Sequence, residues 1–256
     1  MTVLLGKKPR VKTIGIIGGV GWSSTLEYYR VMNERTQSIL GGCHSAQILL
    51  YSIEFGEFAK QERLAAEGDW SAMEATILDA ARRLKAGGAD FVVIASNTLN
   101  SLVNTIEPKV GLPFLRIYNA VGSRVRSTGI KKVALLGTSY TMEASFYRDT
   151  IERNYGIKVV VPNKEERDYI NNAIFDELVK NDVRFDTRVE FMKIIHRMIE
   201  EQKVEGVILG CTEIPLLIKQ RDVSVPVFDT CRIHAESAVD YALGTRDVFY
   251  TNQVSH

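Results

Sequence analysis

Two polar tripeptides each follow a short hydrophobic run, and their side chains could exchange protons with a substrate. Ser96-Asn97-Thr98 comes after Phe91–Ala95, and Cys211-Thr212-Glu213 comes after Gly206–Gly210. A general acid or base must lie within hydrogen-bond reach of the proton that it transfers. Groups on opposite sides of one cleft can take a proton from one face of a carbon atom and return it to the other. Cys211 and Ser96 are therefore the predicted catalytic pair.

The residues after Cys211 predict a helix that would activate the thiol. Thr212 is a good N-cap and Pro215 suits a first helical turn. A helix N-terminus favours a thiolate, so we expect the pKa of Cys211 to lie below about 8.5. We also expect this thiol to face solvent in a cleft, so that truncating it costs about 1 kcal/mol or less.

Free backbone N–H groups at the two strand ends are predicted to hold a substrate carboxylate. They lie beside Asn97, Thr98 and Leu99 in the first half and beside Cys211 in the second. Donors in these positions would also stabilise a carbanion formed when a proton leaves the substrate.

A repeated order of strands and helices must position these groups. Thr13–Gly19, Ala46–Tyr51 and Phe91–Ala95 are predicted strands in the first half, with helices from Ser23 toward Arg35 and over Trp70–Lys85. Ser23, Ser24 and Thr25 are expected to cap the first helix. The second half is predicted to have strands at Lys132–Thr138 and Gly206–Gly210, and helices near Glu143–Asn154 and Arg188–Gln202.

The two halves match at nearly constant spacing. Lys132 follows Thr13 by 119 residues, and Cys211 follows Ser96 by 115, which indicates duplication. The predicted fold class is α/β: two similar Rossmann-like domains with parallel sheets, related by a pseudo-twofold axis. We expect residues 1–115 plus 229–256 to form one domain and residues 116–228 the other, with the active site in the cleft between them.

Composition favours small-molecule chemistry. The 256 residues carry 32 basic and 31 acidic side chains, a net charge of +1, and no basic block stands out, so nucleic acid is not an expected partner. No stretch approaches the roughly 20 apolar residues of a membrane span, and Val3–Leu5 is too short for a signal-peptide core. Three cysteines cannot form a disulfide framework. We expect a cytoplasmic protein.

Five motifs follow one another in a recognisable order: Gly18–Thr25, His44–Gln47, Leu136–Glu143, Gly210–Ile214 and Pro226–Thr230. They resemble those of the aspartate/glutamate racemase superfamily, particularly its broad-specificity amino-acid racemase branch. The similarity runs from about Thr13 to Leu243. The resemblance implies proton exchange on a free amino acid without pyridoxal phosphate, other cofactor or metal, and a homodimer.

The resemblance also implies site residues. Cys211 is one catalytic group, and Ser96 stands where the family has its first catalytic cysteine. The expected substrate contacts are Gly19, Val20, Asn97, Thr98, Leu99, Thr138, Thr212 and Glu213.

Three further departures from the family pattern concern specificity and the first half of the site. The family histidine is Asn100 here, the arginine of aspartate-specific members aligns with Phe58, and their lysine falls near Asp168 or Tyr169, beside Arg167. The last two of these departures argue against restriction to acidic side chains.

Ser96 differs chemically from the cysteine that it replaces. An alkyl hydroxyl titrates closer to about 15.7, the value of bulk water, than to the thiol's 8.5. Ser96 would therefore need a neighbouring group that activates it, would hold a water, or would only donate a proton.

Two other functions are compatible with these residues. A site with one cysteine suits a lyase that decarboxylates malonate-type acids, or an isomerase on the same fold. Loss of the first thiol would also suit a binding protein without catalysis. Cys43-His44 and Cys231–His234 match no standard zinc spacing. Gly19–Ser24 only partly matches the dinucleotide fingerprint.

Overall fold

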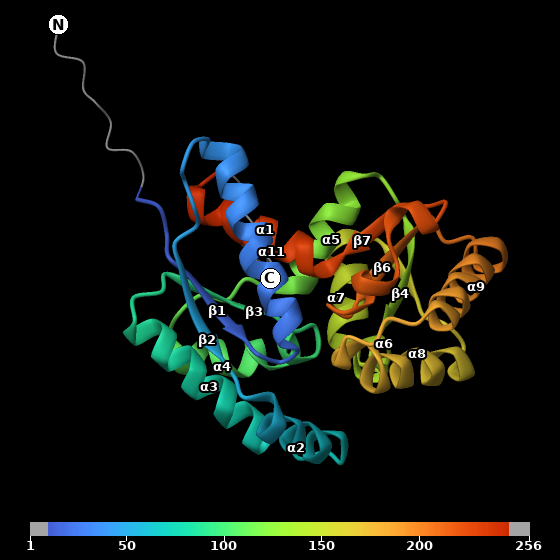
Figure 1. Cartoon of the computed structure of the whole chain (residues 1–256), viewed down its shortest axis with the longest axis horizontal. Helices are drawn as coiled ribbons and strands as arrows, with labels where there is room; N and C mark the ends of the chain where they lie inside the picture. Colours follow the sequence, from blue (N-terminus) through green and yellow to red (C-terminus); the bar gives the residue numbers. More distant parts are fainter. Residues whose placement is uncertain (1–9, 246–256) are drawn as a thin grey trace, which may run out of the picture.

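The computed structural model describes residues 10–245, apart from the side chain of Ala66. Val3–Leu5 and the end of the segment 229–256 lie outside the described residues. Two lobes stand side by side, with the N-terminal half of the chain mainly in one and the middle of the chain in the other (Figure 1). None of the helices within 10–245 combines the length and the apolar character that crossing a membrane requires.

The first sheet has three parallel strands with the earliest one in the middle. Its strands are β1 (Ile14–Gly18), β2 (Ile48–Ser52) and β3 (Phe91–Ile94), in the order β2-β1-β3. Ile14 is level with Ile48 on one side and with Phe91 on the other. All three strands therefore end at the same edge of the sheet, where Ser96 follows β3.

The second sheet repeats this order and adds one strand. It contains β4 (Lys132–Gly137), β5 (Lys158–Val160), β6 (Gly206–Gly210) and β7 (Val227–Asp229), all parallel, in the order β5-β4-β6-β7. The first sheet has a counterpart to β7, because Phe114 forms a parallel bridge with Val92. The predicted α/β fold of two similar parallel units is confirmed.

Helices of very different length connect these strands. The α-helices are α1 (Trp22–Leu40), α2 (Phe55–Ala66), α3 (Ser71–Ala86), α4 (Val103–Val110), α5 (Ile117–Ser127), α6 (Ser139–Glu143), α7 (Ser145–Tyr155), α8 (Lys164–Asp176), α9 (Phe185–Gln202), α10 (Ile214–Leu217) and α11 (Thr230–Leu243). Short 3₁₀ turns occupy Thr98–Leu102, Leu178–Lys180 and Gln220–Asp222.

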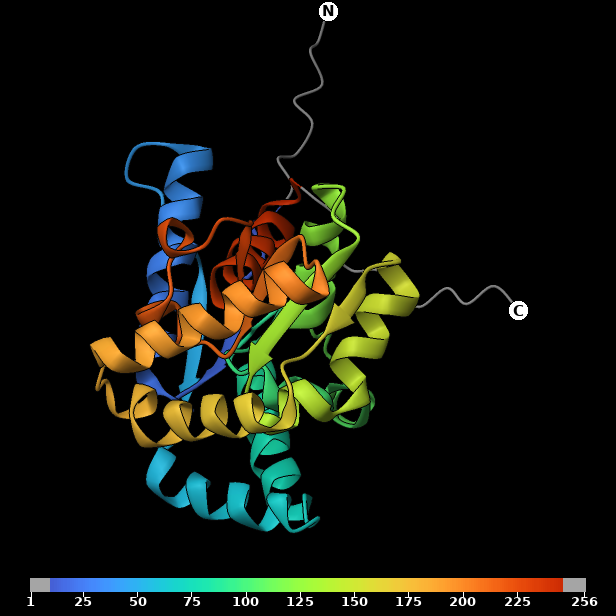
Figure 2. The same ribbon diagram turned by 90° about the vertical axis from the view of Figure 1, so that its right-hand side faces the viewer.

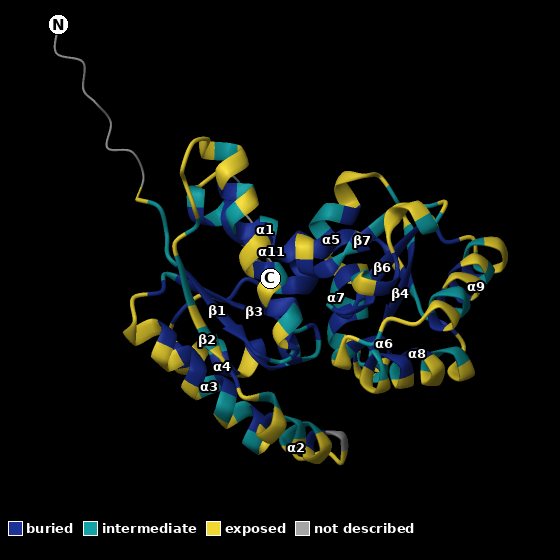
Figure 3. Ribbon diagram, in the orientation of Figure 1, coloured by how far each residue is buried: buried dark blue, intermediate teal, exposed yellow. Residues whose placement is uncertain are grey.

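Alternating side chains on the central strands bury both faces of each sheet. Ile14 and Ile16 pack with α1 and α11, whereas Ile17 packs with α3 and α4. In the second sheet Leu135 lies in a core with α5 and α7, and Leu136 in a core with α8 and α9. Figures 2 and 3 show the helices flanking the second sheet and the buried strands between them. Strands buried on both faces explain the continuous hydrophobic runs in the sequence.

Two helices each pack in the lobe opposite to the sheet that precedes them in the chain. After the Phe114 bridge the chain enters α5, which packs on α7 in the second lobe, and after β7 it enters α11, which packs on α1 in the first. Figure 1 shows α5 and α11 next to each other between the sheets. Two chain crossings therefore join the lobes, and both begin at the carboxyl end of the outermost strand.

The start of α1 differs from the prediction that Ser23, Ser24 and Thr25 cap it. The N-cap is Gly21, in a left-handed conformation with φ 76°, and no side chain caps the helix. Instead, the Ser24 hydroxyl donates to the Gly21 carbonyl oxygen (2.7 Å), and Thr25 Oγ1 accepts from the Gly19 N–H (2.9 Å). The helix begins at Trp22, one residue before Ser23, so these residues lie inside its first turn. Their hydroxyls stabilise the turn after β1 and do not cap the helix.

A buried histidine connects α1, α11 and the crossing segment. His234 is fully buried, with Nδ1 2.8 Å from the Tyr28 hydroxyl and Nε2 2.8 Å from the Leu115 carbonyl oxygen. Because a carbonyl only accepts, Nε2 carries the proton and Nδ1 accepts from Tyr28. Burial lowers the pKa of His234 to about 4, so the ring is neutral in the folded protein.

We expect His234 to make the protein sensitive to acid. An unfolded histidine titrates near 6.5, so the unfolded chain binds more protons than the folded one between that pH and about 4. Folding stability should fall by about 3 kcal/mol as the pH is lowered through this window. His234→Gln should flatten this part of the profile, measured by urea unfolding at several pH values. The exposed-residue control His196→Gln should retain the wild-type slope; equal slopes for wild type and His234→Gln would contradict the assignment.

Candidate active site

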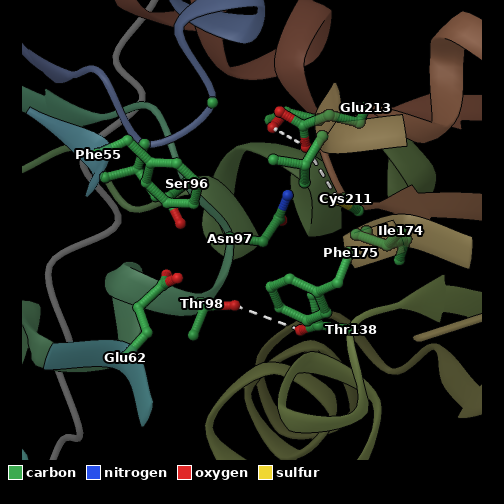
Figure 4. Close-up of a pocket in the computed structure, with 15 residues that line it drawn as sticks. Phe55, Glu62, Ser96, Asn97, Thr98, Thr138, Ile174, Phe175, Cys211 and Glu213 are labelled. Atoms are coloured by element: carbon green, nitrogen blue, oxygen red, sulfur yellow. Dashed lines mark hydrogen bonds between the residues drawn. The ribbon is translucent and has the colours of Figure 1, made fainter. Parts of the chain in front are cut away.

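A pocket lies where the carboxyl ends of β3 and β6 face each other. Its free volume in this structure is about 50 Å³. Eight of the ten predicted site residues line it: Val20, Ser96, Asn97, Thr98, Thr138, Cys211, Thr212 and Glu213. Figure 4 shows the Ser96 and Cys211 sides separated by Asn97. The structure thus brings together two tripeptides 115 residues apart in sequence.

On the first side, local hydrogen bonds hold the turn that carries Ser96. The Leu99 N–H donates to Ser96 Oγ at 3.4 Å, a long and weak contact. Asn100 donates from its amide to the Ser96 carbonyl oxygen (2.7 Å) and accepts from the Ile117 N–H (3.0 Å). Asn100 therefore positions the backbone of Ser96 and anchors the start of α5, while the Ser96 hydroxyl is left weakly held.

Asn97 connects the two lobes beneath the pocket. Its Nδ2 donates to Thr230 Oγ1 (3.0 Å), and that hydroxyl donates to the Leu209 carbonyl oxygen (2.8 Å). This relay joins the end of β3 to the start of α11 and to β6. Asn97 is 4% exposed, and its Oδ1 has no hydrogen-bond partner within residues 10–245. An unpaired buried acceptor is costly, so a donor from a ligand would stabilise it.

On the second side, Cys211 and Glu213 form a buried pair. Cys211 Sγ donates to Glu213 Oε2 at 3.0 Å, and the Thr212 hydroxyl donates to the same oxygen at 2.9 Å. Cys211 is 8% exposed and packs in the core beside α8 and α9, so the expectation of a solvated thiol is wrong. Its truncation should cost more stability than the sequence suggested, because it opens a cavity.

The thiol is also held in its neutral form, contrary to the expected lowering of its pKa. Burial raises the pKa of Cys211 well above its ordinary value, and the neighbouring charge of Glu213 raises it further. Burial likewise raises the pKa of Glu213. The predicted helix is only α10, four residues long with Glu213 at its N-cap position, and Thr212 does not cap it. A single turn supplies too little dipole to outweigh burial and a nearby carboxylate.

A glycine makes room for the other oxygen of Glu213. A Cβ atom at Gly21 would lie 2.3 Å from Glu213 Oε1, and the backbone there has φ 76°. Both the space and the conformation require glycine. Oε1 itself is buried without a hydrogen-bond partner among the described residues. Glu213 is therefore packed against the turn after β1, with one oxygen on the thiol and the other near the Gly21 backbone.

Threonine hydroxyls from both lobes meet at the far wall of the pocket. Thr98 Oγ1 lies 3.3 Å from Thr138 Oγ1 and 3.4 Å from Thr141 Oγ1. Thr138 also caps α6 by accepting from the Thr141 N–H at 3.2 Å. These hydroxyl contacts are longer than the usual 2.7–2.8 Å. The Thr98 and Thr138 hydroxyls can therefore turn to donate to a carboxylate in the pocket.

Two predicted contact residues lie outside the pocket lining. Leu99 is fully buried in the core of the first lobe, and its N–H is directed to Ser96 Oγ rather than to a ligand. Gly19 has φ 91°, and a Cβ there would lie 2.2 Å from the Ile53 carbonyl oxygen. Gly19 therefore permits the close approach of two chain segments, and its neighbours Val20 and Gly21 reach the pocket instead.

Seven further residues line the pocket, four of them on helices outside the motifs. These residues, which the sequence analysis did not identify, are Gly21, Phe55, Glu62, Ile174, Phe175, Val179 and Gly210. The glycines could have been found, since both lie inside quoted motifs. Phe55 and Glu62 on α2, and Ile174 and Phe175 on α8, carry no motif or spacing that marks them. Only the packing of α2 and α8 over the cleft brings them to the site.

The positions that aligned with cationic residues of the family place no cation in the pocket. Phe58 is 1% exposed and belongs to the first core. Arg167 donates to Glu143 (3.0 Å) and to the Pro162 carbonyl oxygen (2.8 Å). Among the other cysteines, Cys43 is exposed and Cys231 is buried against α1.

Known proteins resemble this chain over most of its length. The family described as Asp/Glu/hydantoin racemase matches residues 17–238. The broad specificity amino-acid racemase RacX of Bacillus subtilis is 22% identical over 232 residues, covering 88% of this chain and 96% of the relative.

Solved structures extend the similarity to the whole fold. A candidate Asp/Glu racemase from Yersinia pestis is 43% identical with a TM-score of 0.82, covering 91% of this chain and 99% of its own. An aspartate racemase homologue from Pyrococcus horikoshii is 38% identical with a TM-score of 0.77, covering 90% and 99%.

We expect Glu213→Gln to make the Cys211 thiol more reactive. Removing the carboxylate charge should lower the pKa of the thiol, because that charge is one of the causes that raise it. The test is the pH dependence of alkylation by iodoacetamide in a Cys43→Ala background, read at Cys211 by mass spectrometry. The midpoint should move to lower pH in Glu213→Gln and stay unchanged in the exposed control Glu201→Gln. An unmoved or higher midpoint would show that Glu213 does not govern the thiol.

Proposed function

Because the chain belongs to the Asp/Glu/hydantoin racemase family, we propose that it inverts the α-carbon of free amino acids in the pocket between β3 and β6. The chain is a racemase, an enzyme of the isomerase class. We further propose that its substrates are free amino acids, that Cys211 and Ser96 are the catalytic residues, and that the reaction needs no pyridoxal phosphate. The observation that carries it is the convergence of Ser96 and Cys211 on one pocket from the ends of equivalent strands.

The Cys211–Glu213 pair supplies the base on one face of the substrate. Glu213 Oε2, 3.0 Å from the sulfur, takes the thiol proton, and the resulting thiolate removes the α-proton. The thiol is held neutral and burial raises the pKa of the carboxyl, so a bound ammonium group, which favours the ionised carboxylate, activates the pair. The raised pKa of Cys211 thus keeps the thiol protonated, and ready to act as the acid in the reverse direction, until a substrate arrives.

Ser96 acts on the opposite face as a proton donor. Its hydroxyl is only weakly held by the Leu99 N–H at 3.4 Å, so it can turn toward the substrate. It gives its proton to the carbanion and recovers one from water. A hydroxyl is too weak an acid to form an alkoxide freely, so this step is expected to limit the rate. The Thr98 and Thr138 hydroxyls and nearby N–H groups hold the α-carboxylate and stabilise the carbanion.

The two lobes are proposed to move relative to each other during turnover. We assign residues 1–115 plus 229–256 to one domain and 116–228 to the other. The packing of α11 on α1 and of α5 on α7 supports this division. Each domain contributes one catalytic side chain, so closure would bring both to the α-carbon and exclude water.

Exchange of the α-hydrogen tests the function directly. Purified protein without pyridoxal phosphate, incubated in D₂O with a panel of acidic, polar, basic and apolar L-amino acids, should incorporate deuterium and form the D-enantiomer, measured by proton NMR and chiral chromatography. No exchange across the whole panel would refute the proposal. Release of carbon dioxide from substituted malonates without amino-acid exchange would instead identify a lyase.

Cys211→Ala should lower the exchange rate about 10³-fold or more, because it removes the only thiol in the pocket lining of the described chain. Cys211→Ser matches the volume and should be nearly as inactive, while unfolding less readily than Cys211→Ala, whose cavity should cost about 1–2 kcal/mol. Urea unfolding separates these effects. More than a few per cent of wild-type exchange in both variants would exclude the thiol as the base.

Ser96→Cys should increase exchange, because a thiol gives and takes a proton near neutral pH far more readily than a hydroxyl. We expect a gain of about 10-fold or more in turnover number, and Ser96→Ala should fall below the wild type. Circular dichroism serves as the folding control. If Ser96→Ala matched the wild type, Ser96 would have no part in proton transfer.

A further inference from the structure

The charged groups of the pocket lining are all acidic. Within the described residues the lining contains two carboxylates, Glu62 and Glu213, and no lysine, arginine or histidine. Resting on the racemase activity proposed above, we propose that the pocket selects amino acids with a positively charged side chain, and that Glu62 is the specificity residue that binds this charge. Lysine, ornithine and arginine are substrates of this class.

Glu62 is positioned to meet a ligand. It lies on α2, and Figure 4 shows its carboxylate pointing from α2 into the pocket on the Ser96 side. The structure gives this carboxylate no hydrogen bond or ion pair with any residue between 10 and 245. The nearest lysine along the helix, Lys60, is exposed in its side chain and pairs with Glu57 at 2.6 Å. A largely buried carboxylate without a counter-ion is unfavourable, and a ligand cation would relieve it.

The electrostatic setting of Glu62 supports the same role. Burial raises its pKa to about 7, and the negative charge of Glu213 contributes. Its desolvation and the like charge both oppose ionisation, and a cation held against the carboxylate offsets both. An aspartate or glutamate substrate would instead bring a side-chain carboxylate, besides its α-carboxylate, to a pocket that offers it no cationic side chain among the described residues.

Two other oxygen atoms of the pocket residues can accept hydrogen bonds from the α-ammonium group of a substrate. Glu62 is therefore free to bind a second cation, the one at the end of the side chain. Asn97 Oδ1 and Glu213 Oε1 belong to side chains that are each 4% exposed, and neither oxygen has a hydrogen-bond partner within the described chain. Asn97 lines the pocket from the middle and Glu213 from the Cys211 side, and both oxygens are covered in the unliganded protein. An ammonium group donates three hydrogen bonds and accepts none. These acceptors therefore suit the α-ammonium group that every amino acid carries.

Apolar side chains line the pocket around these polar groups. Phe55 on α2, Ile174 and Phe175 on α8, and Val179 contribute to the lining together with Glu62. A lysine-like side chain has an apolar stem and a charged end, and such stems pack along apolar surface while the charge finds a polar partner. The mixture of apolar walls with one free carboxylate fits a cationic side chain better than an acidic one.

The decisive comparison uses lysine and norleucine, which has the same length of apolar stem but no side-chain ammonium group. We expect wild-type kcat/KM for deuterium exchange to be about 10-fold or more higher for lysine, the scale of a charge-assisted hydrogen bond. Glu62→Gln should lose about 10-fold or more on lysine and change norleucine less than about 3-fold. Glu67→Gln, which removes the same charge at the exposed end of α2, should leave both substrates unchanged.

Other outcomes separate this inference from the function on which it rests. Equal losses on lysine and norleucine in Glu62→Gln would make Glu62 a proton-transfer group and overturn its role in specificity. Wild-type preference for norleucine or aspartate would overturn the charge selection and leave the racemase intact. If no amino acid exchanged, the racemase proposal itself would fail. Calorimetry of lysine and norleucine with wild type and Glu62→Gln would then show whether the pocket binds the cationic side chain more tightly than the neutral one. Equal affinities there would refute the inference.

Discussion

The hydrogen-bond relay from Asn97 through Thr230 to the Leu209 carbonyl oxygen links the parts on which the site depends. It connects the end of β3, the first residue of α11 and the strand that leads into Cys211. Each member is buried, so no water competes for the bonds and their geometry is retained. Ser96 and Cys211 face the same pocket because the residues beside them are tied together.

The chemistry of the pocket follows from an excess of buried acceptors. Glu213 Oε1 and Asn97 Oδ1 are buried without a hydrogen-bond partner among the described residues, and the partly buried Glu62 carboxylate also has none there. Such groups destabilise the folded protein slightly, and a ligand rich in N–H donors recovers that free energy as binding. Burial also keeps the Cys211 thiol protonated, through the raised pKa that desolvation and Glu213 produce. The same burial that strengthens binding therefore sets the protonation state from which catalysis starts.

Duplication explains why much of the site could be predicted. Both halves place a polar tripeptide after their third strand, and both sheets have the first strand at the centre. Parallel strands bring these tripeptides to equivalent edges, so Ser96, Asn97, Cys211 and Thr212 could be identified without coordinates. The position of a residue within a motif did not reveal where its side chain points, however. Leu99 lies in the same turn as Asn97, yet its side chain enters the core, because a 3₁₀ turn directs successive side chains to different sides.

The sequence by itself determined five of the seven strands within the described residues, the repeat and the polar residues at the strand ends, because these depend on local hydrophobic pattern and on spacing along the chain. The short strands β5 and β7, of three residues each, were not predicted. Only the tertiary structure decided the environment of those residues. Cys211 was expected at a solvated helix terminus and instead lies buried beside Glu213, since α10 is a single turn and the Gly21 turn closes over the carboxylate. Glu62 and Phe175 reached the pocket through the packing of α2 and α8, which no local pattern encodes. Burial, and the pKa values that follow from it, are properties of segments brought together from distant parts of the chain.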